Sequence, residues 1–386
     1  MKTAGSLMTD RDVRQAVTRD DLLTLATLCD PHASAISFGF GHVTMPDTAH
    51  HEEVIAIKGL VQQAFAQFAP GPVPVSPSKD LEQILEVAEE IRLNPAWLRL
   101  VFACREQGFW REFDLPSTGP LSVLHVGRRF QLAPLIQSMQ SIRPYCVAAI
   151  ESGKARAFVV RGTEIQEVAG KLAIEESSTR VDDPRVGWSR HVMNGRTEHE
   201  KGYFRHLSHQ LQQLVSEQHA NGLIIGCHQD LWGEVESQFS PLAKDLIGRF
   251  HLAHFDTEAS QVLHMAMPVF AEGQRTRLSA ILREINETPS RGALGLRDVM
   301  DALLAGRVQK LVLCGLPGKT VAECKVCGRM TAIAGRDCAS CGSAEMCYMA
   351  AEEGLIRQAL LTDAEIVFVE TDAVPGFNGA AALLRY

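Results

Sequence analysis

The stretch YCVAAIESGKARAFVV, residues 145–160, decides the fold class. Two apolar runs flank the segment Ser-Gly-Lys-Ala, and this pattern predicts a β-hairpin. The segment EIQEVAG at 164–170 continues the hairpin as a third strand. Two further apolar runs, NGLIIGCHQ at 221–229 and RFHLAHFD at 249–256, predict buried strands. The middle of the chain is therefore predicted to form a β-sheet.

A long helix is predicted between the hairpin and the later strands, from about Glu198 to Ala220. Apolar side chains recur at helical spacing on one of its faces: Phe204, Leu207, Leu211 and Leu214. That face must pack on the sheet to leave water. Strands that alternate with helices in this way predict an α/β fold, with a mixed or parallel sheet covered on its faces.

Similar α/β patterns precede and follow this middle unit. Three strands and a short helix are predicted before it, at 98–107, 108–116, 120–130 and 131–141. A long helix at about 258–287, the strand VQKLVLCG, the helix AEEGLIRQALLT and the strand AEIVFVET follow it. We therefore predict three domains, at 1–142, 143–258 and 259–386.

The composition is that of a globular protein, with 46% hydrophobic and 22% charged residues in 386. No uncharged apolar run of about 18 residues is present, and the first residues lack an apolar signal-peptide core. We therefore expect a cytoplasmic protein without a membrane partner. The net charge of −8 argues against a surface that is basic throughout, so any contact with nucleic acid needs a local basic patch.

Five of the ten cysteines lie in the stretch ECKVCGRMTAIAGRDCASCGSAEMC, residues 323–347. Four of them form the array C-x2-C-x10-C-x2-C: Cys324, Cys327, Cys338 and Cys341. Four thiolates in two tight turns suit tetrahedral zinc, and Gly328 and Gly342 relieve the backbone after each pair. A redox switch would need only one dithiol pair, and no thioredoxin-like context is present. We predict a zinc ribbon with a structural ion; Cys347 is a bystander or a substitute ligand.

The chain resembles the archaeal and eukaryotic class-I peptide release factors and Pelota, the ribosome-rescue factor, as a bacterial relative of that family. The residues that carry the resemblance are LVLCG, the cysteine insertion, AEEGLIRQAL, AEIVFVE and the closing GFNGAAALLRY, together with VGRRFQLAPLIQSMQSIRPYCVAAIESGKARAFVV at 126–160. The resemblance implies a ribonuclease H-like middle domain. It also implies a C-terminal domain with the α/β-sandwich fold of kink-turn RNA-binding ribosomal proteins.

The resemblance further implies a factor shaped like a tRNA that acts at the ribosomal A site. Its partners would be ribosomal RNA and tRNA, and a translational GTPase is an open candidate. Release factors carry a Gly-Gly-Gln loop that helps a water cleave peptidyl-tRNA. The equivalent segment here, RVGWSRHVMNGRTEHEKGYFRHL at 185–207, contains no Gly-Gly-Gln. We therefore assign no catalytic residue and expect a factor that is not an enzyme.

Basic residues remain at the place of that loop. Lys201, Arg205 and His209 recur every four residues beside the apolar face of the helix, and Trp188 offers a ring for stacking on a base. Such a stripe can hold an RNA backbone through phosphate contacts. The residues that we predict to bind RNA are Trp188, Arg190, His191, Asn194, Arg196, Lys201, Arg205 and His209. The alternative for this stripe is a solvated helix face.

The leading functional hypothesis is a translation factor that binds the ribosomal A site, for ribosome rescue or hibernation, without peptidyl-tRNA hydrolysis. One alternative is a peptidyl-tRNA hydrolase in which another residue of the loop at 187–199 orients the water. A second alternative is an RNA-binding module that acts away from the ribosome.

Overall fold

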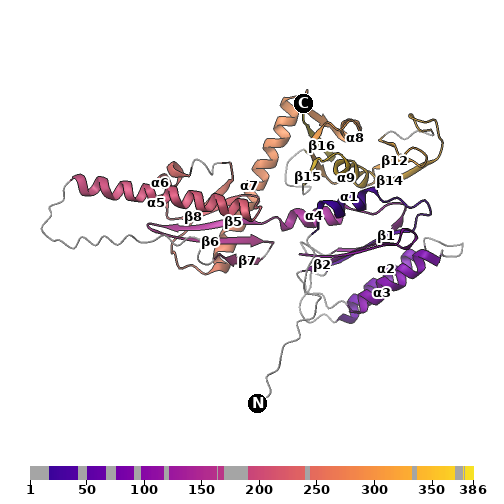
Figure 1. Cartoon of the computed structure of the whole chain (residues 1–386), viewed down its shortest axis with the longest axis horizontal. Helices are drawn as coiled ribbons and strands as arrows, with labels where there is room; N and C mark the ends of the chain where they lie inside the picture. Colours follow the sequence, from indigo (N-terminus) through magenta and orange to yellow (C-terminus); the bar gives the residue numbers. More distant parts are fainter. Residues whose placement is uncertain are drawn as a thin grey trace, which may run out of the picture. The chain divides into compact units, whose positions relative to one another are not determined.

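The structure, a computed structural model, describes residues 17–41, 50–66, 75–90, 97–116, 121–162, 164–168, 190–239, 244–332, 337–369, 377 and 379–386. The chain forms two units, one made of residues 1–140 with 281–386 and the other of residues 141–280. Both units combine sheets and helices, which confirms the α/β class (Figure 1). The division into three domains stays a prediction.

The N-terminal part of the first unit contains an antiparallel sheet in the strand order β3-β2-β1-β4. Its strands are β1 (Ala35–Gly41), β2 (Trp97–Cys104), β3 (Phe109–Pro116) and β4 (Leu121–Gly127). Helices α2 (His50–Ala66) and α3 (Val75–Glu90) cover one face of this sheet (Figure 1). Every residue of β1 is buried, because β1 lies inside the sheet and packs against those helices.

A short helix, α1 (Arg19–Thr27), precedes this sheet. It begins with a capping box, in which the Thr18 hydroxyl accepts a hydrogen bond from the Asp21 N–H and the Asp21 carboxylate accepts one from the Thr18 N–H. Although α1 is near the start of the chain, it packs against α9 (Ala351–Leu361). The first unit is therefore built from both ends of the sequence.

The C-terminal part of the first unit contains two sheets. The larger has the order β10-β16-β11-β15, from strands β10 (Gly292–Leu294), β11 (Val308–Cys314), β15 (Glu365–Phe368) and β16 (Gly379–Leu384). The smaller has the order β13-β12-β14, from strands β12 (Thr320–Cys324), β13 (Met330–Thr331) and β14 (Met346–Ala350). Helices α8 (Gly295–Leu304) and α9 pack against both sheets.

The second unit contains one five-stranded sheet in the order β7-β6-β5-β8-β9. Its strands are β5 (Tyr145–Glu151), β6 (Lys154–Arg161), β7 (Glu164–Glu167), β8 (Leu223–Cys227) and β9 (Leu246–His251). β5, β6 and β7 are antiparallel, whereas β8 is parallel to both β5 and β9. The predicted hairpin is confirmed, since Glu151 pairs with Lys154 across its turn.

Helices cover both faces of this sheet. On one face, α5 (Arg190–Glu217) and α6 (Trp232–Gln238) share a core with side chains such as Ala148 of β5 and Ile225 of β8. On the other face, Val262 and Ala266 of α7 (Ala259–Glu287) are buried against the sheet. Helix α4 (Ala133–Ile142) directly precedes β5 in the chain. A sheet covered on both faces is what the alternating pattern predicted.

The start of α5 differs from the prediction. The helix begins at Arg190 and not near Glu198, so residues 190–199 form its first turns. The proposed loop at 187–199 is therefore wrong for residues 190–199. The Asn194-Gly195 pair, a dipeptide that favours a turn locally, lies inside the helix. Glycine lowers helix stability by only about 1 kcal/mol, and a long packed helix can absorb that cost.

Candidate metal centre and nucleic-acid interface

Two tight turns of the smaller sheet carry the four predicted metal ligands. Cys324 ends β12, and the Gly328 N–H donates to the Cys324 carbonyl over 2.9 Å. The second turn repeats this bond, since the Gly342 N–H donates to the Cys338 carbonyl over 2.8 Å. The two glycines have φ of 71° and 73°, a left-handed conformation that favours glycine. The predicted role of both glycines is confirmed.

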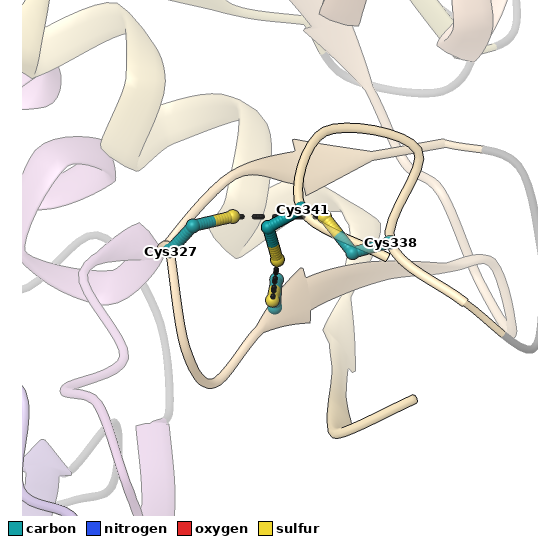
Figure 2. A group of neighbouring side chains, drawn as sticks. Cys327, Cys338 and Cys341 are labelled. Atoms are coloured by element: carbon teal, nitrogen blue, oxygen red, sulfur yellow. Dashed lines mark hydrogen bonds between the residues drawn. The ribbon is translucent and has the colours of Figure 1, made fainter. Parts of the chain in front are cut away.

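These turns bring the four sulfur atoms together (Figure 2). All four Sγ atoms lie within 4.8 Å of one another. The Sγ atoms of Cys324 and Cys341 are 3.6 Å apart, and so are those of Cys327 and Cys338. A tetrahedral ion with bonds of about 2.3 Å to sulfur requires sulfur–sulfur distances of about 3.8 Å. The four thiols therefore fit one tetrahedral metal ion.

Backbone N–H groups favour the ionised thiol at three of these positions. Hydrogen bonds led by the Cys341 N–H lower the pKa of the Cys338 thiol from 9.0 to about 6. Those led by the Cys327 N–H lower the pKa of Cys324. The Ser343 N–H acts on Cys341 in the same direction, but the thiols of Cys324 and Cys327 raise the pKa of Cys341 to about 12. Full ionisation of the group therefore requires a cation, and metal binding would release protons.

Cys347 does not join the group. Cys347 lies in β14, opposite Glu323, and its sulfur faces the Tyr348 carbonyl at 4.0 Å. Within the described ranges, the four cysteines are the one cluster of at least three histidine, cysteine or acidic side chains that is close enough to hold a metal. Four protein ligands leave a tetrahedral ion no open position, which is typical of structural sites.

The second candidate site is the exposed face of α5. The predicted apolar face of this helix is confirmed, since Phe204, Leu207, Leu211 and Leu214 are buried. The side chains of Arg205 and His209 are exposed on the other side, as the predicted stripe requires. Neither makes a hydrogen bond or ion pair with another described residue. No described residue therefore blocks either side chain from contacting a ligand.

The other predicted RNA-binding residues are placed less completely. Trp188 lies outside the described residues. The backbone of α5 includes five more, whose side chains lie outside the description: Arg190, His191, Asn194, Arg196 and Lys201. His206, which the prediction left out, is exposed beside Arg205. Its signal was present in the sequence, since positions three and four apart share a helix face.

The sequence analysis also did not predict an open pocket in the second unit. It has a volume of about 420 Å³ and lies next to the end of β9, where it is lined by His251, His254 and His264. These histidines form no metal-holding group with other described residues. Little in the sequence indicated this pocket. His251 and His254 belong to the run HLAH, and His264 follows ten residues after His254, in α7.

The helices of the described segments include none that is both long enough and apolar enough to cross a membrane.

The middle of the chain matches a known protein family. Residues 131–271 match the model of the bacterial archaeo-eukaryotic release factor family 10. The matched span contains the whole five-stranded sheet, α5 and part of α7. No curated protein matches the sequence.

Several solved structures match this chain over most of its length. An archaeal translation termination factor, aRF1, is 13% identical, with 96% of this chain and 99% of that chain covered and a TM-score of 0.24. Pelota from Archaeoglobus fulgidus is 14% identical, with 96% and 92% covered and a TM-score of 0.33. Dom34 from S. cerevisiae, a translation termination-like factor, is 10% identical, with 95% and 93% covered and a TM-score of 0.38. Likenesses this distant assign no role to any residue here.

Proposed function

Since the chain is a relative of the archaeo-eukaryotic release factor and Pelota class, we propose that it is a translation factor that binds the ribosomal A site. It would act there in ribosome rescue or hibernation. The proposal includes a ribonuclease H-like fold for the five-stranded sheet and the fold of kink-turn RNA-binding ribosomal proteins for the C-terminal part. It also includes a cytoplasmic location and ribosomal RNA as the main partner, with tRNA and a translational GTPase as candidates.

One observation carries the proposal: α5 is a long helix with one side fixed to a sheet, and on its opposite side Arg205 and His209 are exposed and have no partner among the described residues. The buried apolar face gives the helix a defined orientation on the sheet. Arg205 and His209 then point away from that face and are exposed. A guanidinium on a fixed helix can contact phosphates without losing an internal ion pair, so its desolvation is the main cost of binding.

The proposal excludes peptidyl-tRNA hydrolysis of the kind that release factors perform. Release factors use a Gly-Gly-Gln tip, and residues 168–200 contain no such tripeptide. An exposed cationic helix without the glutamine amide supports binding without a chemical step. Arg190, His191, Asn194, Arg196 and Lys201 extend the same helix toward its N-terminus and complete the proposed RNA-binding set together with Trp188.

The metal in the proposal is zinc with a structural role. Thiolate ligands favour soft or borderline ions, and four of them at tetrahedral spacing are typical of structural zinc. The ion would hold the two turns of the ribbon together. The four cysteines leave no position for a water or substrate, so the chain's residues assign the metal no chemical step.

Co-sedimentation with ribosomes tests the proposed function. The purified chain is mixed with vacant 70S ribosomes, and with ribosomes that carry a tRNA in the A site, and is centrifuged through a sucrose cushion. We expect it to pellet with vacant ribosomes and to be displaced when the A site is filled. Equal recovery from both samples, or recovery only with free RNA, would contradict A-site binding and favour the RNA-binding module.

The alternative function, a peptidyl-tRNA hydrolase, makes a different prediction. His191 and Asn194 lie near the start of α5 and offer the groups that could orient a water. Incubation of stalled ribosomes with the protein should leave peptidyl-tRNA intact if the main proposal holds. Release of the peptide, lost in His191→Ala or Asn194→Ala and kept in the exposed control Gln212→Ala, would establish the alternative.

A further inference from the structure

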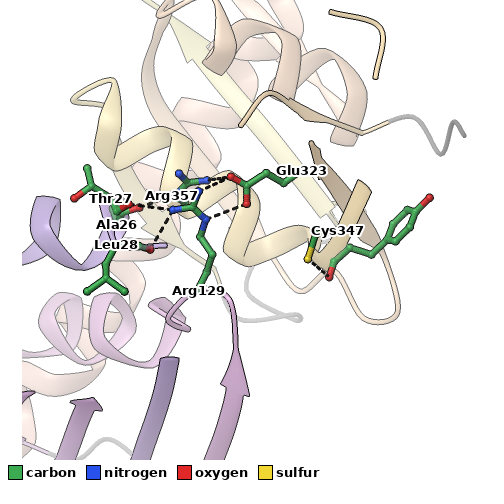
Figure 3. Close-up of polar contacts among 8 residues, drawn as sticks. Ala26, Thr27, Leu28, Arg129, Glu323, Cys347 and Arg357 are labelled. Carbon is green, nitrogen blue, oxygen red and sulfur yellow. Dashed lines mark hydrogen bonds and ion pairs between the residues drawn. The ribbon is translucent and has the colours of Figure 1, made fainter. Parts of the chain in front are cut away.

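A buried carboxylate lies directly before the first metal ligand. Glu323 belongs to β12, one residue before Cys324, and its side chain is only 4% exposed. It receives two hydrogen bonds from Arg129, from Nε to Oε2 over 2.9 Å and from Nη2 to Oε1 (Figure 3). Arg129 follows β4, 194 residues earlier in the chain. This forked pair therefore joins the cysteine ribbon to the N-terminal part of the first unit.

A second arginine reaches the same carboxylate from α9. The Nη1 atom of Arg357 donates to Oε1 of Glu323 over 3.0 Å (Figure 3). The side chains of Arg129 and Arg357 are 13% and 12% exposed, so the whole cluster is nearly removed from water. Burial lowers the pKa of Arg357, and the nearby Arg129 lowers it further. The charge and the hydrogen bond of Glu323 oppose both effects and so help the two guanidinium ions to lie together.

Both arginines also donate to backbone carbonyls at the C-terminal end of α1. Arg357 Nε donates to the Ala26 carbonyl over 2.7 Å. Arg129 Nη1 donates to the carbonyls of Thr27 and Leu28, each over 3.1 Å. The last carbonyls of a helix have no partner within it and carry a partial negative charge, so two cations suit this end. Glu323 thereby holds the end of α1 in place through Arg129 and Arg357.

The position of Glu323 depends on a small sheet. β12 pairs with a two-residue strand, β13, and with the five-residue strand β14. This small sheet packs against α8 and α9, and binding of a structural metal would add folding energy to it. Because Cys324 is a ligand, a bound ion fixes the residue next to Glu323 directly.

We propose that the ribbon is a metal-dependent latch for the N-terminal part of the first unit. With an ion on the four cysteines, Glu323 holds Arg129 and Arg357 against the end of α1. Without the ion, the carboxylate loses its fixed position, the two arginines repel each other, and α1 separates from α9. The latch is a feature of the fold and does not depend on ribosome binding.

Hydrogen exchange of the full-length, metal-loaded protein tests this latch. Exchange is followed by mass spectrometry in peptides from the ribbon, from α1 and, as an internal control, from β5 and β6 of the second unit. Removal of the ion with a chelator under reducing conditions should speed exchange in α1 by more than about tenfold, since a buried charge cluster is left uncompensated. Exchange in β5 and β6 should stay the same, and added zinc should restore α1.

Two variants separate the latch from general loosening of the ribbon. Glu323→Gln keeps the shape of the side chain but removes its charge, and it should open α1 while the ribbon still binds one ion. Arg129→Lys keeps a positive charge but loses the forked geometry, and it should have the same effect. Glu345→Gln changes an exposed carboxylate of the same ribbon and is the matched control.

Three results would overturn the proposal. The first is wild-type protein in which metal removal speeds exchange in the ribbon and leaves α1 unchanged. The second is α1 exchange at the wild-type rate in both variants with the ion bound. The third is equal acceleration in α1 and in β5, which would mean global unfolding and no latch.

Discussion

Glu353 of α9 accepts a hydrogen bond of 2.6 Å from the backbone N–H of Leu132, one residue before α4 begins. Its other oxygen accepts a bond of 3.0 Å from the Ala133 N–H. A side chain from the C-terminal part of the chain thus caps the helix that ends the N-terminal part. Burial raises the pKa of Glu353 from 4.5 to about 7, although the two N–H groups act in the opposite direction.

This carboxyl group predicts a pH dependence of stability. Its folded pKa lies above its unfolded value, so its contribution is complete below about pH 4.5 and is lost as the pH rises through about 7. Denaturant titrations from pH 5 to pH 8 should show the wild type losing up to about 3 kcal/mol relative to Glu353→Gln over that interval. The control Glu345→Gln should follow the wild type. Parallel curves for all three proteins would show that Glu353 does not titrate in this range.

Replacement of a single cysteine tests the metal centre. Cys338→Ser should abolish binding of one zinc ion per chain, because three thiolates leave the tetrahedral site incomplete. Elemental analysis of the dialysed protein measures this directly. Cys347→Ser is the matched control and should retain the ion, since Cys347 lies outside the group. A chain that keeps its ion in Cys338→Ser and loses it in Cys347→Ser would assign the ligands differently.

Truncation of the α5 core tests how firmly this helix is fixed to the sheet. Leu211 is fully buried between α5 and the strands. Leu211→Ala should lower the free energy of unfolding by about 3 kcal/mol, through lost burial and a residual cavity. Chemical denaturation measures this value. Gln212→Ala, one residue further and exposed, should change stability by less than about 0.5 kcal/mol. Equal effects of the two substitutions would mean that the helix is not packed in this orientation.

Salt dependence tests the proposed RNA contact. Arg205→Ala should weaken binding to ribosomes and lower the slope of log K against log salt by about 1, because one phosphate contact is lost. Filter binding over a range of salt concentrations gives the slopes of the wild type and of Arg205→Ala, with Gln212→Ala as the control. An unchanged slope in Arg205→Ala would place the RNA contact elsewhere.

The sequence predicted those parts of the molecule that depend on local pattern. The hairpin around Glu151 and Lys154 follows from two apolar runs and a turn, and the buried side of α5 follows from apolar residues at helical spacing. The metal centre follows from four cysteines whose spacing already specifies two turns. In each case the partners are close in sequence or share one periodic element.

What the sequence could not predict is the pairing of distant residues. Arg357 reaches the Ala26 carbonyl across 331 positions, and Arg129 reaches Glu323 across 194. Such contacts join an isolated charged side chain to a distant side chain or backbone carbonyl, and they leave no periodic pattern in the sequence. The start of α5 was misplaced for a different reason, since Asn194-Gly195 favours a turn locally and the helix continues through it.

The order β10-β16-β11-β15 places the strand formed last in the chain between two strands made about 70 to 90 residues before it. β10 and β11 each pair with β16 and not with each other. During synthesis this sheet therefore stays open along its middle until residues 379–384 have left the exit tunnel of the ribosome that makes them. Until that moment, β11 presents a row of unpaired N–H and C=O groups, which a nascent chain must shield from other strands. The first unit therefore cannot complete this sheet until β16 has been synthesised.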